Sequence, residues 1–262
     1  MSTETRTPLD DRIQVGFPEL PDIASQTHFE ILRQWIKHCD EGHRSCQPAR
    51  NREPYRPPTR LLDLGSKASP TLRLYETRPN ESLPYVALSH PWGPGPYFCT
   101  FTSTVEEFKR SISFEDLPST FRDAVTTTRE LGVRFLWIDS LCIIQGPGGD
   151  FDQEAKRMED VFSAAYCVIA ANSAKGQTDG FLKDRGERQK VLTFQQEDKP
   201  TFYVRRVVDD FEKHVLESPL NKRGWVLQER ALARRTIYFS EEQSYWECGD
   251  GVRCETLTKM DK

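Results

Sequence analysis

VRFLWIDSLCII, residues 133–144, is an apolar run broken only by Arg134, Asp139 and Ser140. A run without regular polar alternation is typical of a strand covered on both faces, as the strands of a parallel sheet are. Two similar runs, YVALS (85–89) and CVIAANS (167–173), stand before and after it in the chain. We therefore expect these three segments to be strands of one parallel sheet.

Helices are predicted between these strands. In residues 119–131 the apolar side chains recur at helical spacing, Ser119 can cap the start, and Gly132 can end the helix. Residues 151–165 show the same periodicity. The alternating order predicts the α/β class, with a parallel sheet core flanked by helices and right-handed crossovers.

Further elements are expected on both sides of this core. Residues 28–39 read as an amphipathic helix, followed by a connector rich in Pro and Arg. Extra N-terminal and C-terminal strands are predicted at RLLDLG (60–65), TLRLYET (71–77), KVLTF (190–194), TFYVRRV (201–207), TIYFS (236–240) and SYWEC (244–248), with a helix at roughly 221–234.

We divide the chain into two parts. Residues 1–60 are the N-terminal helix and connector packed on the core, and residues 61–262 are the α/β domain. The sequence ends at TLTKMDK, soon after a strand-like segment and without a closing helix. This ending suggests the N-terminal part of a longer protein.

The composition narrows the classes of function. The net charge is −4, from 36 basic and 40 acidic residues that are well mixed, which argues against nucleic acid as a partner. No apolar run approaches the roughly 20 residues that a membrane helix needs, and the polar N-terminus lacks a secretory signal. Seven scattered cysteines, with Cys142 and Cys167 inside strand-like runs, indicate core thiols in a reducing, cytoplasmic compartment.

A metal centre is not expected. His38, Cys39, His43 and Cys46 lie within nine residues, but their spacing matches no standard zinc finger. Cys39 also belongs to the apolar face of the first helix, and Cys248 and Cys254 look isolated in the sequence. The chain also lacks a Walker loop and a G-x-G-x-x-G motif.

Polar residues follow each of the three central strands. Ser89, His90 and Trp92 follow the first, Asp139 and Ser140 the second, and Asn172 and Ser173 the third. Parallel neighbours would bring these groups to one edge of the sheet, where α/β proteins bind ligands. Structural roles remain open: a turn at Ser89, a capped turn at Asp139, a core plug at Trp92, or an ordinary hydrogen-bonded His90.

Two predicted helices turn a glutamate toward their packed side. Glu154 falls within the apolar arc of residues 151–165, where a carboxylate is costly unless it is paired or faces a cavity. In the later helix, Gln228 and Glu229 share the face of Trp225 and Leu232, one turn after Arg223. A purely structural bridge from Glu154 to Arg223 or Arg185 is the alternative.

Three blocks of the sequence resemble the fungal heterokaryon incompatibility (HET) domain. They are YVALSHPWG, the stretch from LPSTFRDAV to CVIAANSA, and LNKRGWVLQERALARRTIYFSEEQSYWEC, so the resemblance is strong over residues 85–247. Two departures stand out. The first block usually reads S-Y-C-W-G, whereas here His90 and Pro91 replace the middle pair, and the usual Asp-Trp before the inward glutamate is Asp150-Phe151.

The resemblance implies an effector domain of fungal non-self recognition that triggers cell death when genetically different hyphae fuse. It also implies a TIR-like, flavodoxin-like sheet, and some TIR domains cleave NAD at the nicotinamide–ribose bond. On that hypothesis Glu154 is the catalytic carboxylate, and NAD is the substrate, with no other cofactor. Substrate binding would use Ser89, Trp92, Asp139 and Ser140, supported by a polar network of Arg223, Gln228 and Glu229.

One feature speaks against a direct mapping onto TIR enzymes, because their glutamate follows the third strand whereas Glu154 precedes CVIAA. The alternative is a non-enzymatic signalling scaffold that acts through homotypic oligomerisation, with allelic or receptor-type fungal proteins as partners. A cleft holding Glu154, Trp92 and Asp139 would favour the enzyme. A closed polar network would favour the scaffold.

Overall fold

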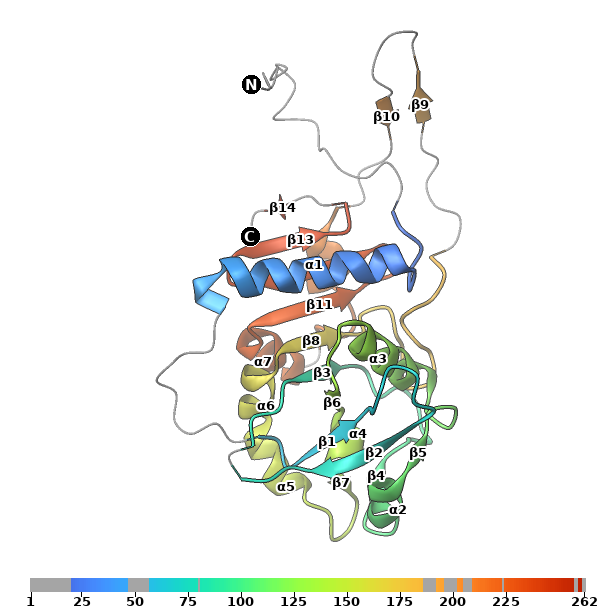
Figure 1. Ribbon diagram of the computed structural model, residues 1–262, viewed down its shortest axis with the longest axis vertical. Helices are drawn as coiled ribbons and strands as arrows, with labels where there is room; N and C mark the ends of the chain where they lie inside the picture. The colour runs from blue at the N-terminus through green and yellow to red at the C-terminus, as the bar shows by residue number, and fades with distance from the viewer. Residues whose placement is uncertain are drawn as a thin grey trace.

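A computed structural model describes residues 20–46, 57–79, 81–185, 192–195, 202–204, 209–222, 224–256 and 259–260 (Figure 1). Its centre is a mixed sheet in the order β14-β13-β12-β11-β8-β3-β6-β1-β2-β5. The strands of this sheet are β1 (Arg60–Asp63), β2 (Thr71–Glu76), β3 (Tyr85–Ser89), β5 (Ile112–Ser113), β6 (Phe135–Trp137), β8 (Cys167–Ala170), β11 (Arg235–Phe239), β12 (Ser244–Cys248), β13 (Gly251–Cys254) and β14 (Lys259–Met260).

The middle of the sheet is parallel, as the apolar runs predict. β3 pairs in parallel with β6 and with β8, and β8 pairs in parallel with β11. Taken in chain order, these four strands stand as 2-1-3-4, an order found in doubly wound sheets. The strands outside this core are antiparallel to their neighbours. The α/β class with extra N-terminal and C-terminal strands is therefore confirmed.

Helices cover both faces of the sheet (Figure 1). The helices are α1 (Gln26–Gly42), α2 (Val105–Arg110), α3 (Ser119–Glu130), α4 (Asp139–Cys142), α5 (Phe151–Glu154), α6 (Met158–Ala164) and α7 (Gly224–Leu232), with shorter turns η1 (Arg44–Cys46), η2 (Ala155–Arg157) and η3 (Glu212–Leu216). The pairs β4 (Thr100–Phe101) with β7 (Ile144–Gln145), and β9 (Leu192–Phe194) with β10 (Phe202–Val204), form two small sheets.

Strand alternation decides which helix packs on which face. Tyr85 donates a hydrogen bond to the Val161 carbonyl of α6, and Trp137 packs edge-on against Phe162 of the same helix. On the opposite face, Trp35 of α1 lies 6.5 Å from Trp246 of β12 between ring centroids. Successive side chains of a strand point to opposite faces. Ser89, on the same side of β3 as Tyr85, contacts Glu229 of α7, and the next residue, His90, contacts Phe121 of α3. Helices α6 and α7 therefore share one face of the sheet, and α1 and α3 share the other.

Several local expectations are wrong in informative ways. The segment 133–144 is not one long strand, because β6 ends at Trp137 and Asp139 starts the short helix α4. Residues 151–165 are not one helix but α5, the 3₁₀ turn η2 and α6. Helix α3 begins with Pro118 as its N-cap and no side-chain cap, so Ser119 lies inside the helix. Gly132, with φ +76, does end α3 as expected.

A buried ionic cluster ties α1 to the C-terminal strands. Glu255 accepts hydrogen bonds from both terminal nitrogens of Arg185 at 2.6 and 2.8 Å, and from the Ser244 backbone N–H at 2.8 Å. His28 of α1 reaches the same carboxylate at 3.1 Å and the Ser244 hydroxyl at 3.0 Å. Glu255 and His28 are both fully buried, so the charge of Glu255 depends on these partners.

The two-part division of the chain stays a prediction. Helix α1 packs on the core as expected, whereas most of the connector, residues 47–56, lies outside the described residues.

Cys142 and Cys167 are buried core thiols, as their positions in apolar runs predict. Within the described part of the chain, no helix has both the length and the apolar character to span a membrane.

Candidate functional site

The carboxyl edge of the parallel strands gathers the polar residues that follow them. Ser89 ends β3, Asp139 comes two residues after β6, and Asn172 comes two residues after β8. From β3 the chain crosses to β6 on one side and returns to β8 on the other. Such a reversal leaves a crevice beyond the strand ends, the usual ligand site of open α/β sheets. β3 and β8 flank this switch point.

Asp139 joins the ends of two strands. Its Oδ2 accepts a hydrogen bond from Trp92 Nε1 at 2.7 Å, and its Oδ1 accepts one from the Ser140 backbone N–H at 2.7 Å. His90 Nδ1 lies 3.9 Å from Oδ1. The Asp139 side chain is 26% exposed, whereas that of His90 is 1% exposed and stands edge-on to Phe121. Asp139 therefore presents a carboxylate to solvent beside a half-buried indole.

Ser89 and Glu229 meet on the other face of the sheet. The Ser89 hydroxyl donates to Glu229 Oε2 at 2.5 Å, which links the end of β3 to α7. Ser89 is buried and Glu229 is partly buried. Ser89, the last residue of β3, and His90, which follows it, therefore point to opposite faces, Ser89 toward α7 and His90 toward α3. Ser89 and Glu229, both proposed as site residues from the sequence, are therefore in contact.

Ser140 is fully buried, and its hydroxyl has no hydrogen-bond partner in the described part of the chain. Asn172, also buried, donates from Nδ2 to the Ser218 hydroxyl at 2.8 Å. Arg223 and the side chains of Trp225 and Gln228 lie outside the described residues, so the polar network predicted around them stays a prediction.

The Trp92 loop is fixed by a close backbone contact. Gly93 adopts φ +73, and a Cβ built on it would stand 2.6 Å from the Gly176 Cα and 2.9 Å from the Lys175 carbonyl oxygen. The Gln177 backbone N–H donates to the Trp92 carbonyl at 3.2 Å, and Gln177 Oε1 accepts from the Phe98 N–H at 2.8 Å. Only a glycine allows this loop to lie against the loop that follows β8.

Glu154 is turned inward, as its position in the apolar arc predicts, and it is 6% exposed. Its Oε1 accepts from the Thr59 hydroxyl at 2.5 Å and lies 3.5 Å from Arg157 Nη1. Thr59 immediately precedes β1, whose start lies at the carboxyl edge because β1 runs antiparallel to β6. Among the described residues, Glu154 forms no hydrogen bond with Ser89, Trp92 or Asp139.

Of the two arginines proposed as structural partners of Glu154, Arg185 is bound elsewhere, and the pairing with Arg223 stays a prediction. Arg185 belongs to the Glu255 cluster, and Arg223 lies outside the described residues. Sequence reasoning also missed the neighbouring pair of Arg60 and Asp150. Arg60 Nη2 donates to Asp150 Oδ2, and Asp150 Oδ1 accepts from the Ile144 N–H at 2.8 Å. Asp150 is the first residue of the Asp150-Phe151 pair, which stands where the family usually has Asp-Trp.

A groove lies beside α1, on the face of the sheet that α1 and α3 cover. Its volume is about 770 Å³, and it is lined by residues of α1, Lys67 and Glu130. Glu130 is the last residue of α3, so the groove lies between α1 and the end of that helix.

Four potential metal ligands lie at the amino edge of the sheet. They are Cys39, His43, Cys46 and Cys248, and Cys248 pairs with Arg235 at the start of β11.

Replacing Trp92 by Phe is expected to lower the free energy of unfolding by about 1–2 kcal/mol, because a hydrogen bond to a carboxylate is lost while the ring volume is largely kept. Urea unfolding measures the change. Tyr97→Phe is the matched control, since its hydroxyl donates to the Gly93 carbonyl at an exposed position and water can replace it. Equal losses for the two variants would contradict a stabilising role for the Trp92–Asp139 bond.

The comparisons with known proteins agree with the motifs in the sequence. The family model described as "Heterokaryon incompatibility protein (HET)" matches residues 85–229, more than half of the chain. A protein of Neurospora crassa, heterokaryon incompatibility protein 6, OR allele, is 26% identical over 222 residues, covering 68% of this chain and 32% of its own length. The chain thus spans about a third of that relative.

No solved structure matches the chain, and the TIR likeness implied by the sequence resemblance stays a prediction. The matched residues include β3, β6 and β8, together with the carboxyl-edge residues Ser89, Trp92, Asp139, Glu154 and Glu229. The chain therefore belongs to the heterokaryon incompatibility (HET) family.

Proposed function

We propose that this chain is an effector domain of fungal heterokaryon incompatibility that triggers cell death in the cytoplasm. The match to the HET family over residues 85–229 supports this role, as does the similarity to a Neurospora protein named for incompatibility. Its partners on this proposal are allelic or receptor-type proteins from a genetically different hypha, and further copies of the chain itself.

For the chemistry, we propose hydrolysis of NAD at the bond between nicotinamide and ribose. The observation that carries this is the contact of Trp92 with Asp139 next to the switch point of the sheet. An indole beside a partly exposed carboxylate offers a stacking face for a nicotinamide or adenine ring and an acceptor for ribose hydroxyls. Ser89 lies at the neighbouring strand end, where it would contact the same ligand.

The reaction needs a carboxylate near the ribose. The glycosidic C–N bond breaks, nicotinamide leaves with the bonding electrons, and a water molecule adds to the ribose carbon and loses a proton. The intermediate cation resembles an oxocarbenium ion, which an adjacent carboxylate stabilises. Glu154 is the sequence-based candidate for this role. Glu229 is a second candidate from the structure, since it reaches the Ser89 hydroxyl at the switch point.

The test is incubation of the purified chain with NAD⁺, alone and when fused to a dimerising partner. We expect nicotinamide release, and we expect Glu154→Gln to reduce it by about 100-fold or more. Asp152→Asn is the matched control, because Asp152 is an exposed acidic residue of the same helix. Loss of release in Glu229→Gln but not in Glu154→Gln would move the catalytic role to Glu229.

The scaffold is the second candidate function, and a specific observation favours it. Glu154 already accepts from Thr59 and lies beside Arg157, and Glu229 accepts from Ser89, so both carboxylates have partners within the protein. Cell death after expression in a fungal host separates the two hypotheses. An absence of nicotinamide release with cell death intact in Glu154→Gln and Glu229→Gln would overturn the enzyme and support the scaffold.

A further inference from the structure

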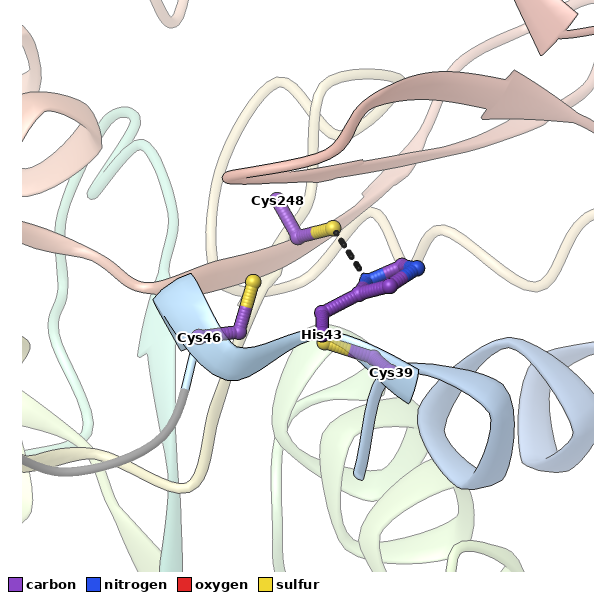
Figure 2. A group of neighbouring side chains, drawn as sticks. All are labelled: Cys39, His43, Cys46 and Cys248. Carbon is purple, nitrogen blue, oxygen red and sulfur yellow. Dashed lines mark hydrogen bonds between the residues drawn. The ribbon is translucent and has the colours of Figure 1, made fainter. Parts of the chain in front are cut away.

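Four potential metal ligands converge at the amino edge of the sheet, far from the carboxyl edge in the fold. The Sγ atoms of Cys39, Cys46 and Cys248 and a ring nitrogen of His43 all lie within 4.8 Å of one another. Figure 2 shows the side chains turned toward a common centre, three from the end of α1 and the turn after it, and Cys248 from β12. The three cysteines are buried and carry free thiols.

Local structure explains how these residues meet. Helix α1 ends at Gly42, and the His43 N–H bonds to the Cys39 carbonyl at 3.2 Å. The turn η1 then brings Cys46 back, with its N–H bonded to the His43 carbonyl at 3.1 Å. On β12, Cys248 shares the strand face of Trp246 and Ser244, which α1 covers. The helix and the strand therefore present their ligands to each other.

The surroundings of the ligands match those of a metal site. His43 Nδ1 faces Cys248 Sγ at 3.4 Å, while His43 Nε2 lies 3.4 Å from an Asp250 carboxylate oxygen. A carboxylate on the second ring nitrogen is how proteins orient a histidine toward zinc. The Asp250 backbone N–H also points at Cys248 Sγ, at 3.4 Å. Such an N–H group stabilises a thiolate.

The spacing of the donor atoms fits tetrahedral coordination. Zn–S bonds of about 2.3 Å and Zn–N bonds of about 2.0–2.1 Å place neighbouring ligand atoms roughly 3.5–3.8 Å apart. The Nδ1–Sγ distance of 3.4 Å is close to this range. A small inward shift of the remaining sulfurs, now within 4.8 Å, completes the set. Three sulfurs and one imidazole nitrogen form one of the usual ligand sets of structural zinc.

We propose that Cys39, His43, Cys46 and Cys248 bind a structural zinc ion that fastens the C-terminal end of α1 to the hairpin of β12 and β13. Three Zn–S bonds and one Zn–N bond form, and the three thiol protons pass to solvent. The closed set of four protein ligands leaves no position for a substrate, which makes this a structural site and not a catalytic one.

The first test is the metal content of the full chain, purified without added metal or chelator. We expect about one zinc ion per chain. Replacement by Co²⁺ should give the intense visible bands of tetrahedral cobalt and a thiolate-to-metal charge-transfer band. A strong chelator should lower the melting temperature by several degrees, and added Zn²⁺ should restore it.

Variants identify the ligands. Cys46→Ser, Cys248→Ser and His43→Ala should lose the zinc, whereas His43→Cys should keep it, because four cysteines also form a tetrahedral zinc site. The matched controls are Cys254→Ser, a buried cysteine of the neighbouring strand β13, and His38→Ala, an exposed histidine of α1. Both should retain the metal.

Three results would overturn the proposal, and the first two need only the unaltered chain. In the first, the purified chain contains no metal and its melting temperature does not respond to chelator or Zn²⁺. In the second, intact mass shows a disulfide among Cys39, Cys46 and Cys248. In the third, a folded Cys248→Ser variant retains zinc.

Discussion

Glu255→Gln is expected to lower the free energy of unfolding by about 3–5 kcal/mol, the range seen when one member of a buried ion pair is removed. The side chain of Glu255 is fully buried, and that of Arg185 is only 5% exposed. The substitution keeps the shape of the side chain but removes the charge that holds Arg185 and His28 in place. An uncompensated guanidinium then remains in the protein interior.

The same cluster predicts how stability depends on pH. Burial alone would raise the pKa of the Glu255 carboxyl, but the hydrogen bonds and charges of His28 and Arg185 outweigh burial and lower that pKa to about 2. An unfolded glutamate has a pKa of about 4.3. The contribution of Glu255 is therefore complete above about pH 4.3 and is lost as the pH falls toward 2.

Urea unfolding at several pH values measures both effects. The unaltered chain should lose stability steeply between about pH 4.3 and pH 2, and Glu255→Gln should show a flatter curve over that range. Glu106→Gln is the control, because Glu106 pairs with Lys109 on the surface and its side chain is 76% exposed. If Glu255→Gln were as stable as Glu106→Gln, the cluster would not stabilise the fold.

Gly93→Ala is expected to be the second most damaging single change, with two separate costs. A left-handed φ of +73 costs a non-glycine residue about 1–2 kcal/mol. The added Cβ would also stand 2.6 Å from the Gly176 Cα, and relief of such a clash by backbone movement costs about 1–3 kcal/mol more. The clash is with backbone atoms, so no side-chain rotation can remove it.

Gly132→Ala separates these two costs. Gly132 has a similar φ of +76, but a Cβ there meets nothing within 4 Å, so only the cost of the left-handed backbone remains. Thermal or urea unfolding of both variants should therefore place Gly93→Ala well below Gly132→Ala in stability. Nearly equal losses would mean that the loops at Gly93 and Gly176 are not pressed together in solution.

The sequence predicts those parts of the fold that depend on local pattern. The apolar runs that begin at Tyr85 and Cys167 became the buried parallel strands β3 and β8, although β8 ends at Ala170. Periodicity alone placed Glu154 on the inner side of its helix. These features depend on residues a few positions apart. The same holds for Gly132, which ends α3 with a positive φ.

The remaining features depend on contacts between distant residues, which periodicity does not contain. The helix expected at 151–165 breaks next to Arg157, whose guanidinium is bound to the Thr59 hydroxyl and the Pro57 carbonyl, each at 2.6 Å. Cys248 looked isolated in the sequence, yet it faces His43, which is 205 residues away in the chain.

The candidate site shows the same division between local and distant information. Ser89, Trp92 and Asp139 were placed at strand ends from sequence, but their partners were not. Glu229 was assigned to a supporting network and in fact reaches Ser89 directly, while His90, set aside as an ordinary histidine, lies beside Asp139. Pairing across a sheet edge requires the strand order, and the sequence does not state that order.

The strand order also determines how far the chain can be shortened. Residues 85–229 keep β3, β6 and β8 but remove β1 and β11, which cover the two outer strands of that trio. A polypeptide trimmed to those residues would carry two bare strand edges, each with a row of unpaired backbone groups open to edge-to-edge aggregation. We therefore expect the part of this HET domain that folds on its own to be wider than residues 85–229 and to include at least β1 and β11.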